Sequence, residues 1–118
     1  MKKFQFAFLM VAMVFVLATD AQNTFTTTGQ KVIVDNDKIK VTEYNGMPDK
    51  DVCGIGKHDH PAHLTIVLSD ASVKITTAEG KVVEQKVPAG TTFWSDAETH
   101  TVVNSGKGVA HLYIIEPK

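Results

Sequence analysis

Three of the five histidines in this chain fall within one short segment, Lys57-His58-Asp59-His60-Pro61-Ala62-His63. A fourth, His100, stands far along the sequence. Imidazole nitrogens suit divalent transition metals better than Mg²⁺ or Ca²⁺. The sequence therefore predicts a site for iron, nickel, copper, zinc or manganese with His58, His60, His63 and His100 as ligands. The alternative is a set of surface or packed histidines with no shared partner.

The spacing is compatible with one ion. On an extended strand, His58 and His60 project to the same face about 7 Å apart, close enough for both rings to converge on a metal. His63 has the wrong parity for that face in an unbroken strand. Pro61 lies between them and interrupts strand pairing, so a new strand can begin with His63 turned toward the same point.

Four other residues near the predicted site are expected to be structural or to play a lesser part in it. Cys53 is expected to be a small buried apolar residue, although a thiol beside a metal could ligate it or be oxidised. His111 is expected to be a packed histidine, with support of a metal ligand as the alternative. Glu43 is a speculative acid or base because it shares the expected inward parity of its strand. Asp59 should point away from the histidines on either side of it.

Five residues around the second half of the predicted site are assigned structural roles. Phe93 and Trp94 are expected to line the barrel wall, with stacking on a ligand as the alternative. Asp96 and Glu98 are expected in a solvated loop. Asn104 is expected to satisfy backbone groups, with orientation of the His100 ring as the alternative. No residue is assigned as catalytic.

The elements that must position these residues are short strands. Runs rich in Val, Ile, Thr and aromatic residues alternate with turn residues such as Ala78-Glu79-Gly80 and Pro88-Ala89-Gly90, and no stretch keeps helical periodicity. The predicted strands are 31–35, 38–44, 55–60, 63–69, 72–77, 81–87, 91–95, 99–104 and 110–115. This many short strands predicts an all-β domain closed on itself as a sandwich or barrel.

The chain begins as a signal peptide would. Residues 1–21 contain two lysines, an apolar run and small residues, which predicts cleavage after Ala21 and a secreted or periplasmic protein. A retained membrane anchor is the weaker alternative because the run is shorter than the roughly 18–20 residues that span a bilayer. Residues 22–34 are then an N-terminal extension or first strand, and 35–118 the barrel domain.

Charge and cysteine content exclude several classes of protein. The 118 residues carry 12 lysines, no arginine and 13 acidic residues, for a net charge of −1. Without a basic stripe to neutralise phosphates, nucleic acid is not expected as a partner. One cysteine supports neither an internal disulfide nor a Cys-only zinc site.

The motifs resemble those of the small single-domain cupins from about residue 35 to the end. The matching residues are His58-Asp59-His60 with His63, then Gly90, then His100 followed by Asn104. The resemblance implies a jelly-roll β-barrel with a divalent metal near the barrel mouth, and a homodimer.

The sequence departs from the cupin pattern at three places. His63 stands where cupins usually have a glutamate, Asp70 replaces a glycine, and Asp96-Ala97-Glu98 replaces Pro-x-Gly. Asp70 is tolerable because Asp visits left-handed conformations readily. Exchange of the glutamate for His63 predicts a neutral shell of three or four histidines.

Two functions are compatible with such a centre. One is an exported metalloenzyme of the oxygenase or isomerase type, which would use an open coordination position on a small organic molecule. The other is a non-catalytic metal- or ligand-binding module, which a closed four-ligand shell would favour.

Overall fold

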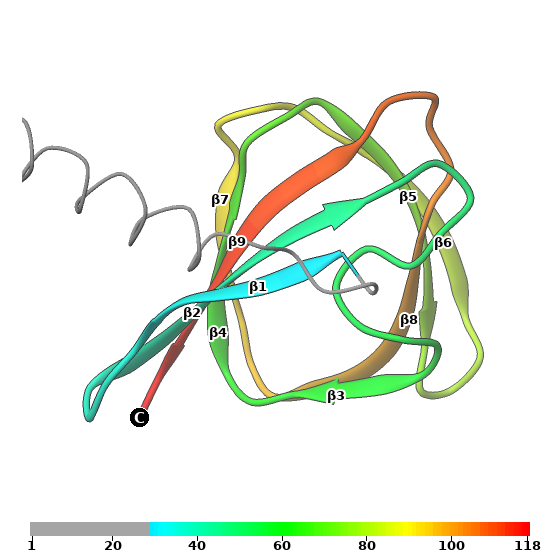
Figure 1. The fold of residues 1–118 in the computed structure, drawn as a ribbon. Helices are drawn as coiled ribbons and strands as arrows, with labels where there is room; N and C mark the ends of the chain where they lie inside the picture. The colour runs from blue at the N-terminus through cyan, green and yellow to red at the C-terminus, as the bar shows by residue number, and fades with distance from the viewer. Residues whose placement is uncertain (1–28) are drawn as a thin grey trace, which may run out of the picture.

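The computed structural model describes residues 29–118, all of them in strands, turns or loops. The predicted signal peptide and the extension as far as residue 28 lie outside the described residues. Nine strands follow one another within these described residues (Figure 1): β1 Gln30–Asp35, β2 Ile39–Gly46, β3 His58–His60, β4 His63–Val67, β5 Ala71–Thr77, β6 Val82–Val87, β7 Thr92–Ser95, β8 Glu98–Asn104 and β9 Ala110–Pro117.

The strands form two antiparallel sheets that curve around a common core. One sheet has the order β1-β2-β9-β4-β7 and the other β3-β8-β5-β6. From β7 to β9 the chain alternates between the two sheets, which produces the jelly-roll barrel seen end-on in Figure 1. The predicted all-β barrel is therefore confirmed.

Alternation along the strands sorts side chains into the barrel interior and its outer surface. The core between the sheets is an apolar cluster of Tyr44, Val52, Cys53, Val73, Val102, Ala110, Leu112 and Ile114. In the five-stranded sheet, Thr65 of β4 lies opposite Phe93 of β7 and Ile114 of β9, so these residues face inward together. His63, two residues before Thr65, has the same inward parity.

The turns follow the sequence signals that predict them. Gly80 has a φ of 89° in the turn that joins β5 to β6, and Gly90 has a φ of 90° after Pro88, a region that favours glycine. Asn104 is only 1% exposed. Its amide donates to the Gly46 and Gly108 carbonyls and accepts from the Gly106 N–H, which confirms its predicted role with backbone groups.

Two local expectations are wrong. The strand predicted from residue 55 begins only at His58, because Gly54 and Gly56, with φ values of 155° and 55°, turn the preceding segment into a loop. Asp70 does not have a positive φ. Its carboxylate instead accepts a hydrogen bond from the Ala89 N–H at 2.9 Å, so a turn contact and not a left-handed backbone explains its place.

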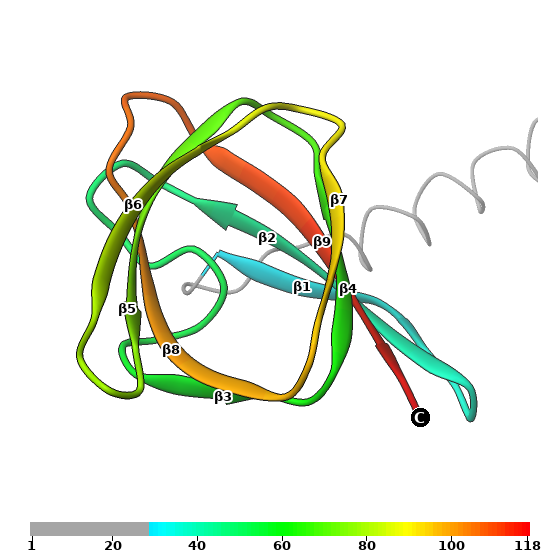
Figure 2. The ribbon, with the colours of Figure 1, turned by 180° about the vertical axis from the view of Figure 1, so that it is seen from behind.

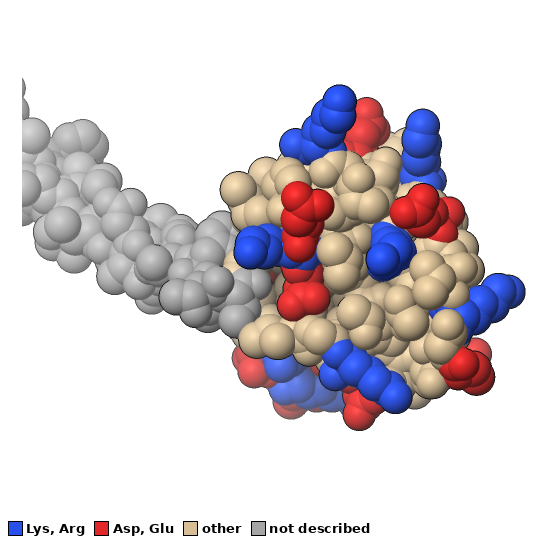
Figure 3. Space-filling model, turned by 90° about the vertical axis from the view of Figure 1, so that its right-hand side faces the viewer, with Lys and Arg blue, Asp and Glu red and all other residues tan. Residues whose placement is uncertain are grey.

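Charged side chains lie on the outer surface. On the face of Figure 3, lysines and acidic residues are interspersed among uncharged residues, and neither sign gathers into a continuous patch. Within residues 29–118 there is no helix with the length and hydrophobicity needed to cross a membrane.

Candidate metal centre

Strands β3 and β8 place three histidines against one another. His58 of β3 lies directly opposite His100 of β8, and His60 lies two residues along β3 on the same face. The ring centroids of His58 are 4.7 Å from His60 and 4.8 Å from His100. Asp59 between them is exposed and accepts a hydrogen bond from the Thr99 hydroxyl, which confirms that it points away from the cluster.

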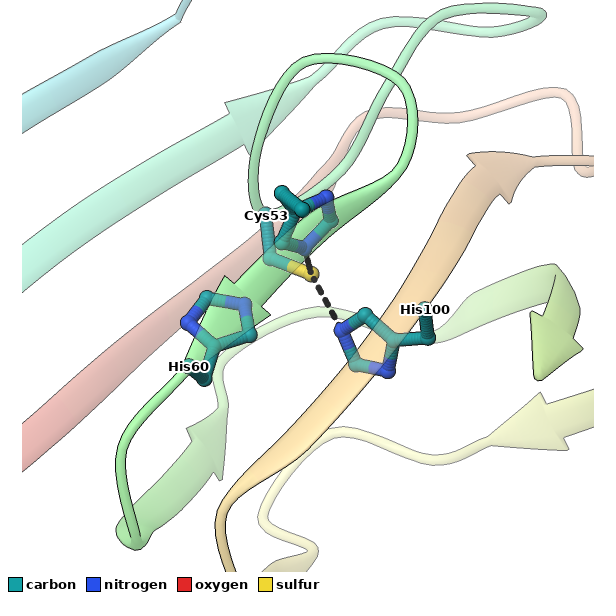
Figure 4. Close-up of side chains that lie close together, drawn as sticks. Cys53, His60 and His100 are labelled. Atoms are coloured by element: carbon teal, nitrogen blue, oxygen red, sulfur yellow. Dashed lines mark hydrogen bonds between the residues drawn. The ribbon is translucent and has the colours of Figure 1, made fainter. Parts of the chain in front are cut away.

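The loop before β3 adds a sulfur atom to the three imidazoles. Cys53 Sγ lies 3.4 Å from His58 Nε2 and 3.6 Å from His100 Nε2, and Figure 4 shows it between the rings. The loop folds back this closely because Gly54 has no side chain. A Cβ on Gly54 would lie 2.6 Å from Cγ of the His58 ring, so only glycine fits there without displacing His58.

This close approach makes the Gly54→Ala variant informative. We expect its methyl group to displace the His58 ring and to lower metal affinity by about tenfold or more, as loss of ligand orientation does. Competition with a chelator measures the change. Gly108→Ala is the matched control, because a Cβ there meets no atom within 4 Å. Equal affinities for the two variants would show that His58 does not hold the metal.

Hydrogen bonds at Nδ1 direct the other ring nitrogen of two histidines toward the sulfur. His58 Nδ1 donates to the Gly56 carbonyl at 2.8 Å. His100 Nδ1 lies 3.3 Å from a carboxylate oxygen of Glu98. With the proton on Nδ1, each Nε2 carries a free lone pair, which is the arrangement typical of metal-bound histidines.

The donor set fits a transition metal. One ligand atom from each of Cys53, His58, His60 and His100 lies within 4.8 Å of the others. Metal–nitrogen bonds of about 2.0–2.1 Å and a metal–sulfur bond of about 2.3 Å at tetrahedral angles separate nitrogen from sulfur by about 3.5 Å. The two measured sulfur–nitrogen distances, 3.4 and 3.6 Å, bracket that value.

A second observation supports the same conclusion. Within residues 29–118, His60 Nε2 is the single buried side-chain nitrogen or oxygen without a hydrogen-bond partner, and His60 is only 6% exposed. Burial of an unpaired polar atom is costly. A metal ion held by the cluster would satisfy this nitrogen.

Burial also sets the protonation state of the ligands. Burial and, to a smaller extent, the neighbouring histidines together lower the pKa of His60 to about 4. Burial likewise lowers the pKa of His100, against the opposing effect of Glu98. It raises the pKa of the Cys53 thiol to about 12, with Glu98 and Asp51 acting in the same direction. At neutral pH the metal-free cluster therefore holds neutral His60 and His100 rings and a Cys53 thiol, and metal binding releases the thiol proton.

The low pKa of His60 predicts how the stability of the metal-free protein depends on pH. In the unfolded chain, histidine has a pKa of about 6.5. Below that value the unfolded state takes up a proton that folded His60 excludes until about pH 4. The free energy of unfolding is therefore highest above pH 6.5 and falls between about pH 6.5 and about pH 4. Urea denaturation across this range should show a shallower fall for His60→Gln, whereas parallel curves would contradict the assignment.

His63 lies beside the cluster and outside the four-donor group. Its ring centroid is 4.9 Å from that of His60, and its Nε2 is 3.7 Å from a carboxylate oxygen of Glu98. Its Nδ1 donates to the Pro61 carbonyl at 2.7 Å. The chain breaks at Pro61 as expected and turns His63 inward. The structure thus groups three of the four predicted histidines with Cys53, while His63 is adjacent to them.

Two acidic residues have roles different from those expected. Glu98 is the first residue of β8 and not a solvated loop residue: it is half-buried and contacts both His63 and His100. Glu43 is not directed inward. Thr42 and Tyr44 are its buried neighbours on β2, and Glu43 pairs with His111 on the other face of the sheet.

His111 and Trp94 also lie outside the centre. The His111 Nε2 atom bonds the Glu43 carboxylate at 2.5 Å, so the ring is held by a partner of its own. Trp94 pairs with Leu64, is 53% exposed, and alternates with the inward-facing Phe93. The expectation that Trp94 lines the barrel wall is therefore wrong, whereas the expectation for Phe93 is confirmed.

The interior of the barrel contains a cavity of about 290 Å³ that reaches the metal centre. Cys53 and His100 line it together with His63 and Glu98. The remaining lining is mostly aliphatic. A molecule in this cavity would therefore lie beside two of the four donor residues.

The fold is that of small cupin domains. A cupin domain from Bordetella pertussis Tohama I superposes with a TM-score of 0.68 at 24% identity, covering 75% of this chain and 91% of that chain. A double-stranded β-helix protein from Klebsiella pneumoniae gives 0.60 at 19% identity, covering 83% and 85% of the two chains. The polyketide cyclase RemF from Streptomyces resistomycificus gives 0.55 at 20% identity, covering 75% of this chain and 63% of that chain. No protein-family model matches the sequence, and no curated protein matches it significantly.

Proposed function

We propose that this cupin-fold protein binds one transition-metal ion through Cys53, His58, His60 and His100 and uses it in a reaction of a small organic molecule held in the barrel. The observation that carries the proposal is the shared wall: Cys53 and His100 belong both to the donor cluster and to the lining of the cavity. A divalent ion there would supply Lewis acidity or lower the pKa of a bound water molecule.

The donors narrow the choice of metal. Three imidazoles and one thiol suit zinc, copper, iron or nickel, whereas manganese prefers oxygen ligands. Of the metals predicted from the histidines alone, manganese is therefore the one we no longer favour. The Cys53 thiol is the reason, because histidine ligands alone do not distinguish among these five metals.

The protein's own residues would prepare the site. The Gly56 carbonyl orients His58, and the Glu98 carboxylate orients His100, so that both Nε2 atoms are presented to the ion. Aliphatic side chains make up much of the cavity wall and lower the local dielectric constant, which strengthens electrostatic interactions with a bound molecule. RemF is an enzyme with the same fold, so the barrel is compatible with catalysis.

A non-catalytic metal-binding module is the alternative. Four protein donors fill a tetrahedral shell, which is typical of structural zinc sites. The same four residues thus favour this function if the ion takes no further ligand. The two proposals differ in whether the bound metal accepts a small ligand from solution.

Azide binding to the cobalt(II)-loaded protein distinguishes these two functions. We expect azide to change the visible absorption of the bound cobalt in a saturable way, because the centre adjoins an accessible cavity. Val82→Ala is the control, since Val82 is exposed and belongs neither to the donor cluster nor to the cavity lining. A spectrum that azide leaves unchanged, together with no exchange of metal-bound water, would overturn the catalytic proposal in favour of the module.

Export after cleavage behind Ala21 and assembly into a homodimer stay predictions from the sequence.

A further inference from the structure

We infer that the cavity binds a neutral, largely apolar molecule that presents a hydrogen-bond donor, such as a hydroxyl group, to His63 and Glu98. The inference rests on the proposed function in taking the cavity as the substrate site. Binding itself is a property of the cavity walls, so it is measured in the metal-free protein.

The walls favour an apolar molecule. Aliphatic and aromatic side chains make up most of the lining: Val52, Val67, Ala71, Val73, Ile75, Val87, Phe93, Val102, Leu112 and Ile114. The volume of about 290 Å³ lies at the lower end of the roughly 300–1,000 Å³ range of small-molecule sites. The occupant is therefore a compact molecule that buries hydrocarbon surface.

The charges of the lining exclude an anion. Within residues 29–118, no lysine lines the cavity, and Glu98 is its only acidic residue. The lysines of the neighbouring strands, Lys74 and Lys86, are exposed. A carboxylate or phosphate away from the metal would meet the negative charge of Glu98 and no lysine, and His111, which also lines the cavity, is already paired with Glu43. Burial of such an anion is therefore costly.

Two hydrogen-bond acceptors face each other at the polar end of the cavity. His63 Nδ1 donates to the Pro61 carbonyl, so in the tautomer that this hydrogen bond selects Nε2 is the acceptor. That nitrogen is 3.7 Å from a carboxylate oxygen of Glu98, too far for a direct hydrogen bond. His63 is 2% exposed. An O–H or N–H group of a molecule bound beside these two atoms would donate a hydrogen bond to one of them.

The cavity opens to solvent between the edges of the two sheets. β6 is the edge strand of one sheet and β7 that of the other, and Figure 2 shows β6 at the left and β7 at the right of the barrel. Gln85 of β6 and Phe93 of β7 line the cavity and are nevertheless exposed, Phe93 by 43%. A small molecule can therefore enter between these two edge strands.

Three probes of similar size separate the chemical requirements. Benzyl alcohol is neutral and carries a donor, benzyl methyl ether is neutral without one, and benzoate is an anion. By calorimetry or NMR titration of the metal-free protein, we expect benzyl alcohol to bind at least about tenfold more tightly than either of the others. Equal or tighter binding of benzoate, equal binding of the ether, or no binding of any probe would overturn the inference.

Two valines of β6 provide matched variants. Val87 lines the cavity, whereas Val82 is 55% exposed and does not. Val87→Phe should weaken benzyl alcohol binding by at least about tenfold, and Val82→Phe should leave it within about twofold. Ala71→Leu, on the residue opposite Val87, fills the same space if Val87→Phe does not fold. Equal effects at positions 82 and 87 would place the probe outside the cavity.

Zinc content, measured after zinc loading of a second portion of the same preparation, separates this inference from the proposed function. If zinc binds at the four donors but no probe binds in the cavity, the substrate class is wrong and the metal centre stands. If benzyl alcohol binds with the expected selectivity but the protein retains no zinc, the substrate class stands and the metal-dependent function is wrong.

Discussion

Replacement of His60 and His100 together by alanine is expected to abolish retention of the metal. The two rings come from different strands, and both offer a nitrogen to the four-donor cluster. Loss of one residue that merely orients a ligand costs about 10- to 100-fold in affinity. Removal of two direct ligands should therefore cost at least about 100-fold to 10,000-fold. Inductively coupled plasma mass spectrometry after dialysis against a mild chelator measures the retained metal.

The His111→Ala variant is the control for this prediction. It also removes a histidine, but from a pair with Glu43 outside the cluster, so metal content should be unchanged. His63→Ala should retain the metal as well, because His63 is adjacent to the donor group without belonging to it. Full metal content in the His60 and His100 double variant would refute the site.

Cys53→Ser is expected to produce the second large effect. Its Sγ lies within 3.6 Å of two ring nitrogens, and no other cysteine is present in the sequence. The substitution should remove the thiolate-to-metal charge-transfer absorption of the cobalt(II) or copper(II) protein completely. Affinity should fall by at least about 10- to 100-fold, since a hydroxyl is a poorer ligand than a thiolate for these metals.

Serine is the right replacement because it is nearly isosteric and introduces no large cavity. Cys53 also belongs to the apolar core cluster, so a larger change would confuse metal loss with unfolding. Far-ultraviolet circular dichroism of the metal-free variant checks that the sheets are intact. An unchanged charge-transfer band in folded Cys53→Ser would show that sulfur is not a ligand.

Alternation of residue types predicted most of the strands because each strand has one face toward the core. Val73 and Ile75, for example, face inward between exposed or half-buried neighbours. The same rule failed on β2, where both faces are partly buried: Val41 is buried on the side of Glu43, and Thr42 and Tyr44 are buried on the other. Parity alone therefore assigned Glu43 to the wrong face.

The histidines of the centre were predictable because they lie on strands, whose geometry fixes the direction of each side chain. Cys53 was harder to place because it lies in a loop whose path depends on the backbone freedom of Gly54 and Gly56. The available signal was the sequence Cys53-Gly54-Ile55-Gly56 immediately before the histidines. The burial of Cys53 was predicted correctly. Its position next to the His58 and His100 rings could not be predicted, because it is set by the path of the folded loop.

Glu98 was misplaced for a related reason. The residues that precede His100 contain no run of β-formers, so the sequence favoured a loop there. Pairing of His60 with Glu98 across β3 and β8 extends the strand to include it. The cross-strand pairing is a tertiary effect that local propensity does not contain.

X-ray absorption spectroscopy of the zinc-loaded protein tests the central claim most directly, because it measures the atoms bound to the metal. The four-residue centre predicts nitrogen neighbours at about 2.0–2.1 Å and one sulfur neighbour at about 2.3 Å, and the sulfur contribution should disappear in Cys53→Ser. A shell of nitrogen and oxygen atoms alone in the unaltered protein, with no sulfur and no imidazole scattering, would contradict it.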